Sequence, residues 1–265
     1  MNALELDRVS LSRGEKTILS DVTLAVGEGE FVGVLGANGA GKTTLMKAVL
    51  GLLPLDKGDI RVFGKPVSRG NAAIGYMPQT RSLPPELRLS GRDFLATAIR
   101  GDRWGVPLPG KDDRREIDRC LDAVGAQHLA SHSLGDMSGG ERQRLMIAQA
   151  LIGSPRLLLL DEPLISLDPH QQGIVVHLVR DLSRSLGLTV LFSAHELNQL
   201  LGAVDRVLYL GHGHAALGKV DEVINPDTLS RLYDAPIEVV RAGGHIFVMS
   251  GGQIVERDRH EGHTH

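Results

Sequence analysis

The chain has 265 residues, a formal net charge of −3 and one cysteine. Hydrophobic residues make up 42% of it, which is enough for a packed core and excludes general disorder; a single cysteine excludes an internal disulfide. Acidic and basic residues are mixed along the chain without a basic block, so we expect no nucleic-acid partner.

The chain contains no run near the roughly 20 apolar residues that cross a bilayer. Its start, MNALELDRVSL, lacks the basic and apolar regions of a signal peptide. We therefore expect a cytoplasmic protein that only a partner would hold at a membrane. Cys120 lies on an apolar stripe with helical spacing, which predicts a buried core position.

The first third of the chain predicts mainly strands. Residues 4–12 and 22–26 alternate between apolar and polar, as half-buried antiparallel strands do. Residues 31–35 are an apolar run next to glycine and predict a buried central strand. A helix is expected from Lys42, a turn at 56–59, and strands at 60–63 and 73–77.

Residues 80–154 have a helical pattern broken at proline and glycine, which predicts a helical subdomain inserted into an α/β core. Buried strands at 156–161, 188–194 and 206–210 then alternate with a helix over 169–186 and a short helix from Glu196. This alternation indicates a parallel sheet covered on both faces. Short elements at 226–233, 236–240 and 245–250 precede a polar tail that contains histidines.

The segment GANGAGKT, residues 36–43, fits the phosphate-loop pattern and lies between a predicted strand and a predicted helix. Gly36, Gly39 and Gly41 let the backbone N–H groups surround an anion. Lys42 is placed to reach the β- and γ-phosphates and Thr43 to bind Mg²⁺. The alternative is a glycine-rich turn that binds nothing.

The segment RLLLLDEP, residues 156–163, predicts a buried strand that ends in two acids. The carboxyl ends of strands are where α/β sheets place their ligands. Asp161 is predicted to hold Mg²⁺ and Glu162 to act as general base toward the attacking water. The alternative is that both acids only cap the next turn.

The segment MSGGE, residues 137–141, predicts a helix that begins with a capping box of Ser138 and Glu141. Capping alone leaves the pair Gly139 and Gly140 unexplained, because glycine costs about 1 kcal/mol against alanine in a helical turn. Open backbone at a helix N-terminus suits a phosphate, so this segment predicts a second phosphate contact.

The order along the chain is GANGAGKT, Gln79 after IGYMP, MSGGE, RLLLLDEP, Asp168 in SLDP and His195 after VLFSA. Together they resemble the nucleotide-binding subunit of ATP-binding cassette (ABC) transporters, over residues 4–210. The resemblance implies an α/β fold: a P-loop NTPase (RecA-like) core with an N-terminal antiparallel β subdomain and an inserted α-helical subdomain. The implied ABC ATPase domain is 1–235, with its core at 1–79 and 155–235 and the insertion at 80–154; 236–265 would be a C-terminal extension with a histidine-containing tail.

The resemblance also implies an ATP hydrolase with ATP and Mg²⁺ as cofactors. Two copies would associate head-to-tail, each ATP lying between the phosphate loop of one copy and the signature segment of the other. Gln79 would touch Mg²⁺ and water and link to the membrane partner, Asp168 would cross the dimer interface, and His195 would contact the γ-phosphate. On its own, a histidine between strand and helix is more often a capping residue.

The predicted site residues fall into five groups. The catalytic residues are Glu162, His195, Gln79 and Lys42. The ATP-binding residues are Arg13, Gly36, Ala37, Asn38, Gly39, Ala40, Gly41, Lys42, Thr43 and Thr44. The Mg²⁺ ligands are Thr43, Gln79 and Asp161. The signature residues, acting in trans, are Ser138, Gly139, Gly140 and Glu141, and Asp168 is the interface residue.

The chain departs from the family pattern in three places. Arg13 stands where an aromatic residue commonly stacks on adenine, although a guanidinium plane can also stack on a base. Met137 and Glu141 replace the commoner leucine and glutamine of the signature. Leu164 and Ile165 replace the usual small polar pair, and nothing in the sequence explains that change.

Within the family, IGYMPQ, LSRLYDAPIEVV and the histidine tail look most like ATPases of zinc or manganese uptake systems. That likeness implies transmembrane permease subunits, an extracytoplasmic substrate-binding protein and a peripheral position on the cytoplasmic face of the membrane. Five histidines could bind a divalent ion, or simply belong to polar segments: His260, His263, His265, His212 and His214. A second hypothesis is a soluble ABC ATPase of an assembly complex, such as one for iron–sulfur clusters, without a permease.

Overall fold

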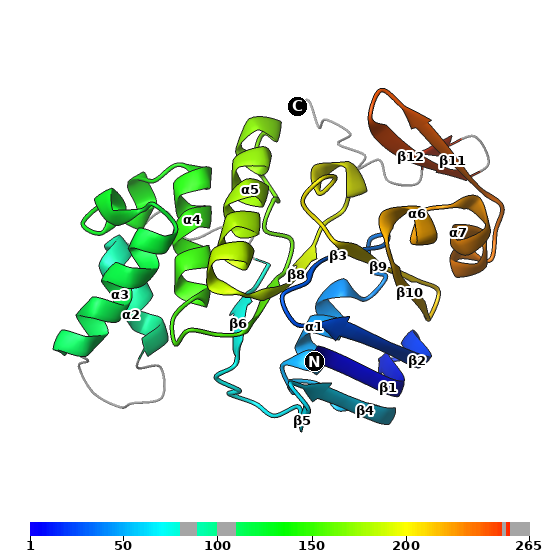
Figure 1. Ribbon diagram of the computed structural model, residues 1–265, viewed down its shortest axis with the longest axis horizontal. Coiled ribbons are helices and arrows are strands. Elements are labelled where there is room, and N and C mark those ends of the chain that lie inside the picture. The colour runs from blue at the N-terminus through cyan, green and yellow to red at the C-terminus, as the bar shows by residue number, and fades with distance from the viewer. Residues whose placement is uncertain (80–88, 100–109, 251–252, 255–265) are drawn as a thin grey trace.

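The computed structural model describes residues 1–79, 89–99, 110–250 and 253–254. Its centre is a six-stranded sheet with the order β10-β9-β3-β8-β7-β6 (Figure 1). The strands are β3 (Phe31–Leu35), β6 (Ile74–Met77), β7 (Leu157–Leu160), β8 (Thr189–Ser193), β9 (Arg206–Gly211) and β10 (His214–Gly218). All neighbours pair in parallel except β9 and β10, so the predicted parallel sheet is confirmed.

The central sheet is buried on both faces because successive side chains of a strand point to opposite sides. Val32 and Val34 of β3 join the cluster that contains α1 (Lys42–Val49) and the N-terminal sheet. Phe31 and Leu35 join the other cluster, which includes the helical part of the chain. Helix α1 is thus packed between two sheets, and the loop that precedes it is held at both ends.

The N-terminal sheet is antiparallel, with the order β2-β1-β4-β5. Its strands are β1 (Asn2–Arg13), β2 (Lys16–Gly27), β4 (Lys57–Val62) and β5 (Lys65–Pro66), longer than the sequence pattern predicted. The turn expected at 56–59 is wrong in three of its four residues, because β4 already begins at Lys57. Gly58 has φ +80°, and a Cβ there would lie 2.3 Å from the carbonyl oxygen of Arg8. This glycine serves close strand approach rather than a turn.

The described residues between 89 and 154 are mainly helical, as predicted. They form α2 (Gly91–Ile99), α3 (Lys111–Ala123) and α4 (Gly139–Ala150), with 3₁₀ turns at Gln127–Leu129 and Leu134–Asp136. Cys120 is fully buried on α3, as the helical stripe predicted. Expectations for 80–88 and 100–109 lie outside the described residues. In Figure 1 these helices lie at one end of the molecule, beside α5 (Pro169–Leu186).

The last third of the chain contains elements that the sequence pattern missed, namely β10 and α6 (Val220–Val223). Helix α7 (Pro226–Tyr233) follows, then a small sheet of β11 (Ile237–Ala242), β12 (His245–Ser250) and β13 (Gln253–Ile254). The Asn198 side chain, in the 3₁₀ turn Leu197–Gln199, accepts a hydrogen bond from the Ile246 N–H and donates one to its carbonyl oxygen, at 2.8 and 2.9 Å. The small sheet is therefore fixed to the segment that follows β8.

At Gly75 the helical part approaches the central sheet closely. A Cβ on Gly75 of β6 would lie 2.0 Å from the carbonyl oxygen of Ala150, at the end of α4. We expect Gly75→Ala to lower the free energy of unfolding by about 1–3 kcal/mol through overpacking. The matched control is Gly173→Ala, since Gly173 lies in α5 with no atom within 4 Å of its Cβ position.

The control substitution should raise stability by about 0.5–1 kcal/mol, because alanine favours a helix over glycine. Thermal unfolding of the two variants and the wild type measures both effects. Equal melting temperatures for wild type and Gly75→Ala would show that β6 and α4 are not in this close contact.

Candidate nucleotide-binding site

The segment 36–41 forms an open loop between β3 and α1. Gly36 and Gly41 have φ values of +143° and +108°. A Cβ on Gly36 would lie 2.4 Å from the Leu210 carbonyl oxygen, and one on Gly41 would lie 2.1 Å from Ile18 Cγ2. Both positions therefore require glycine for conformation and for space. Ala37, Asn38 and Gly39 are exposed, so the loop presents its backbone to a ligand.

Lys42, the first residue of α1, is 5% exposed, and its Nζ donates a hydrogen bond to the Gly36 carbonyl oxygen at 2.8 Å. A cavity of about 240 Å³ opens beside the loop. It is lined by Arg13, Lys16, Ile18, Gly39, Gly41, Lys42, Thr43, Thr44 and Glu162. The structure thus gathers Arg13, Glu162 and five of the nine predicted phosphate-loop residues around one space. The other four, Gly36, Ala37, Asn38 and Ala40, do not line this cavity.

Asp161 follows β7 at the carboxyl edge of the sheet and is fully buried. Its Oδ1 accepts hydrogen bonds from the Thr43 and Ser193 hydroxyls, both at 3.1 Å. Burial raises the pKa of Asp161, while those two hydroxyl contacts oppose the rise. Burial and the nearby Asp161 carboxylate also raise the pKa of Tyr76 to about 12.

The second carboxylate oxygen of Asp161, Oδ2, is buried without a hydrogen-bond partner among the described residues. A buried carboxylate oxygen of this kind, beside the Thr43 hydroxyl and with Gln79 nearby, offers the hard oxygen donors that Mg²⁺ prefers. The donor set therefore fits the predicted Mg²⁺ ligands Thr43, Gln79 and Asp161.

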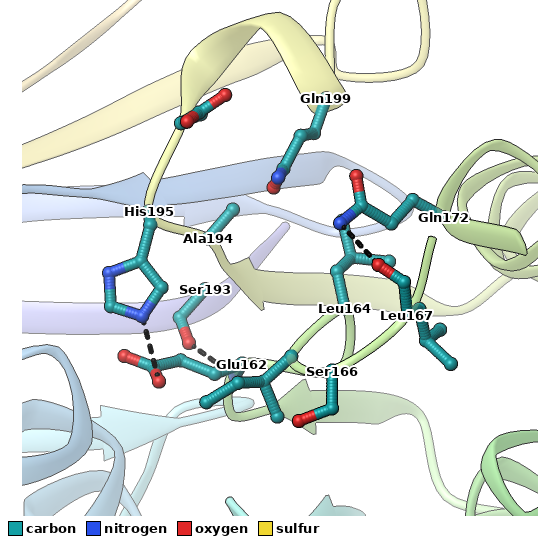
Figure 2. Close-up of a pocket in the computed structure, with 11 residues that line it drawn as sticks. Glu162, Leu164, Ser166, Leu167, Gln172, Ser193, Ala194, His195 and Gln199 are labelled. Carbon is teal, nitrogen blue, oxygen red and sulfur yellow. Dashed lines mark hydrogen bonds and ion pairs between the residues drawn. The ribbon is translucent and has the colours of Figure 1, made fainter. Parts of the chain in front are cut away.

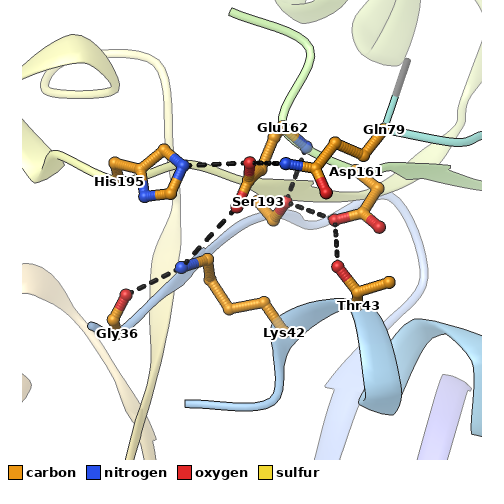
Figure 3. Close-up of polar contacts among 8 residues, drawn as sticks. All are labelled: Gly36, Lys42, Thr43, Gln79, Asp161, Glu162, Ser193 and His195. Carbon is orange, nitrogen blue, oxygen red and sulfur yellow. Dashed lines mark hydrogen bonds and ion pairs between the residues drawn. The ribbon is translucent and has the colours of Figure 1, made fainter. Parts of the chain in front are cut away.

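Three side chains from separate elements converge on the Glu162 carboxylate (Figure 3). Gln79, which follows β6, donates a hydrogen bond to Oε2, and His195 Nε2 lies 2.9 Å from the same oxygen. Lys42 Nζ lies 3.9 Å from Oε1. The carboxylate is buried among charged and polar groups and faces the cavity beside the loop, which is the environment of a reacting acid or base.

Ser193, at the end of β8, is a site residue that the sequence interpretation missed. Its Oγ accepts a hydrogen bond from the Glu162 N–H at 2.7 Å and donates one to Asp161. Glu162 has φ +51°, a left-handed conformation that costs free energy in a non-glycine residue. Ser193 therefore fixes both acids. Its position at the end of a predicted buried strand was the signal that could have found it.

The segment between Glu162 and α5 lines a second pocket of about 410 Å³ with the segment that follows β8 (Figure 2). Leu164 is 4% exposed and belongs to the large core cluster, which explains an apolar residue at this position. Ile165 lines the pocket, and the structure offers no further reason for it. Asp168 is exposed and caps α5 by accepting a hydrogen bond from the Gln171 N–H at 2.9 Å.

The signature segment lies apart from the phosphate loop. Ser138 caps α4, and the predicted capping box is present: the Ser138 N–H donates to Glu141 Oε2 at 2.8 Å, and the Glu141 N–H donates to Ser138 Oγ at 3.3 Å. Neither residue lines the described cavity at the loop, and Figure 1 places α4 at a distance from α1. A Cβ on Gly140 would meet the flexible end of the Gln171 side chain, Oε1 at 2.3 Å; because this side chain can move aside, packing does not by itself require glycine here.

The histidines considered as metal ligands do not form a site in the described part of the chain. His212 lies in the turn between β9 and β10, with its ring 6.0 Å from the ring of Tyr233, and His214 begins β10. The described residues contain no group of three or more histidine, cysteine, aspartate or glutamate side chains that could hold a metal ion. His260, His263 and His265 lie outside the described residues.

The chain has a glycine-rich loop between a central parallel strand and a helix. A buried lysine and a threonine follow the loop, and the threonine lies opposite an aspartate at the end of another strand. This arrangement defines a P-loop nucleotide-binding protein. The family model described as ABC transporter matches residues 19–165. The chain belongs to this family, whose members are ATP-hydrolysing transport ATPases that bind ATP and work as dimers with transmembrane permease partners. It is therefore the ATPase subunit of an ABC transporter.

Similar proteins include the zinc transport system ATP-binding protein TroB of Treponema pallidum, 31% identical over 89% of this chain and 88% of that protein. The manganese transport system ATP-binding protein MntB of Bacillus subtilis is 32% identical over 92% of this chain and 99% of that protein. The lipopolysaccharide export system ATP-binding protein LptB of Haemophilus influenzae is 33% identical over 88% of this chain and 97% of that protein. Similarity at this level therefore spans transporters with different cargo.

Among solved structures, a metal-chelate-type ABC transporter in an inward-facing conformation is similar, with a TM-score of 0.78 and 27% identity. The similarity covers 94% of this chain and 96% of that one. It supports the predicted fold, an α/β P-loop core with added β and helical parts. None of the described helices has the length and apolar character that a bilayer span requires.

Proposed function

We propose that this chain drives the uptake of a divalent metal ion, zinc or manganese, through a transmembrane permease. The support is that TroB and MntB, each about one-third identical over most of the chain, are named for zinc and manganese transport. The metal would be cargo, and the ATPase itself need not touch it. An extracytoplasmic substrate-binding protein and a position on the cytoplasmic face of the membrane belong to the same proposal.

The observation that carries the enzymatic part is the convergence of Lys42, Gln79 and His195 on Glu162. We assign Glu162 as the general base that takes a proton from the attacking water, with Gln79 and His195 orienting the water and the γ-phosphate. Lys42 would leave Glu162 for the β- and γ-phosphates, while the backbone N–H groups of residues 36–44 hold the remaining oxygens.

Thr43, Asp161 and Gln79 would hold Mg²⁺, which when bound neutralises charge on the phosphates. Arg13 lines the same cavity from the β1–β2 hairpin and is assigned to the base. Ser193 has no proposed contact with ATP; it would keep Asp161 and Glu162 in place.

The site of one copy is incomplete in this proposal, because Ser138, Gly139, Gly140 and Glu141 line no part of the described cavity at the loop. These residues would bind the γ-phosphate held by a second copy, arranged head-to-tail, and the exposed Asp168 would lie at the interface. Each ATP then joins two chains, and hydrolysis removes the joining γ-phosphate. We propose residues 1–235 as the ATPase domain, with the core at 1–79 and 155–235, the insertion at 80–154 and an extension at 236–265.

The cargo is tested by measuring the metal content of cells that lack this chain. Cellular zinc or manganese is expected to fall and to return when the wild-type chain is supplied, but not when Glu162→Gln is supplied. Unchanged zinc, manganese and iron would overturn the metal proposal and leave the ATPase assignment intact. The relatives compared above are all named for transport systems, and this does not favour the second hypothesis, an assembly ATPase without a permease. Co-purification of the chain with a multi-span permease from detergent-extracted membranes distinguishes a transport ATPase from an assembly ATPase.

A further inference from the structure

A phosphate loop presents its N–H groups inward only if its carbonyl groups are turned outward and given partners, since buried or constrained carbonyls need hydrogen bonds. The loop and the first turn of α1 supply several of these partners. The Gly36 carbonyl accepts from Lys42 Nζ at 2.8 Å (Figure 3). The Ala37 carbonyl accepts from the Ala40 N–H at 2.9 Å, and the Gly41 carbonyl from the Leu45 N–H at 2.8 Å.

The Gly39 carbonyl, at the exposed tip of the loop, has a partner from outside it. Lys16 Nζ donates a hydrogen bond to this oxygen at 2.7 Å. Lys16 is the first residue of β2 and pairs with Arg13 across the β1–β2 hairpin. Both side chains line the cavity beside the loop, together with Lys42. The hairpin thus brings two cations to the site, and one of them already holds the loop.

We propose that Lys16 is a positioning residue for the phosphate loop. Its ammonium group keeps the Gly39 carbonyl turned outward, so the neighbouring N–H groups stay available to the phosphates, and adds positive charge at the cavity wall. The proposal rests on the ATP site proposed above. Because Lys16 acts through the loop, it strengthens the binding of the phosphates, and by the same factor whatever base is attached. Arg13, by contrast, is assigned to the base.

The test is calorimetric titration of the full chain with ATP and, separately, with inorganic tripolyphosphate, both with Mg²⁺. Lys16→Met removes the charge and the donor, Lys16→Arg retains both, and Lys57→Met removes an equal charge from an exposed position on β4. We expect Lys16→Met to weaken both ligands by the same factor, about 3- to 10-fold for one lost charge-assisted hydrogen bond at an exposed site. Lys16→Arg should restore most of the affinity, and Lys57→Met should leave both affinities unchanged.

Arg13→Met provides the contrast, since it should weaken ATP by a larger factor than tripolyphosphate. Equal affinities for wild type and Lys16→Met would overturn the role of Lys16, and so would an effect on ATP alone or the same loss in Lys57→Met. If Lys16→Met melts at a lower temperature than wild type, Lys16→Val replaces it, because valine also lacks the charge and the donor and favours a strand; the same loss of affinity for both ligands is expected. Failure of the wild-type chain to bind ATP would instead overturn the proposed function, so the two failures are distinguishable.

Discussion

Replacing Glu162 with glutamine is expected to leave ATP binding intact and to lower kcat by about 10²- to 10⁴-fold, the usual contribution of a general base. Glutamine has the shape of glutamate and can still bond Gln79 and His195, so the site should keep its geometry. It cannot take a proton from water. The nucleotide should therefore remain bound without hydrolysis, and the two chains should stay associated around it.

The measurement pairs steady-state ATPase rates with ATP affinity and with the apparent mass of the protein in ATP. The matched control is Glu238→Gln, which removes the same charge from an exposed residue of β11. The control should behave as wild type. If Glu162→Gln hydrolyses ATP at the wild-type rate, Glu162 is not the general base, even though its carboxylate contacts Lys42, Gln79 and His195.

The features that the sequence predicted well are those that local chemistry determines. Runs such as Phe31–Leu35 have no polar residue to place on an exposed face, so they predict buried parallel strands. The phosphate loop follows from the positive φ values at Gly36 and Gly41, which few other residues tolerate. The capping box of Ser138 and Glu141 is likewise contained within four residues.

The features that were missed depend on contacts between distant segments. Lys16 lies 23 residues from the carbonyl that it binds, and Ser193 lies about 30 residues from the two acids that it fixes. No local pattern distinguishes such a lysine or serine from a solvated one. Gly58 was interpreted as a turn residue because glycine punctuates turns and tight strand crossings alike. The apolar residue at Leu164 is explained by its place in the large core cluster, which no local pattern shows.

The central claim is that two copies share each ATP. A helix N-terminus facing an anion supplies only about 0.3–2 kcal/mol, whereas moving a pair from 1:99 to 99:1 associated requires about 5.5 kcal/mol. Two triphosphates, each contacted by both chains, could supply that difference. The claim predicts that damage to the phosphate loop and damage to the signature segment can compensate when they lie in different chains.

The direct measurement uses two variants, Lys42→Ala and Ser138→Arg, each expected to be inactive alone. In a mixed dimer, the intact phosphate loop of one chain faces the intact signature segment of the other. Random pairing of equal amounts then restores about one quarter of the wild-type sites, because half of the dimers are mixed and each has one intact site. ATPase activity that rises on mixing, with its maximum near equal amounts, is the predicted result. No activity at any ratio, with both variants folded and wild-type chains active, would contradict the shared site.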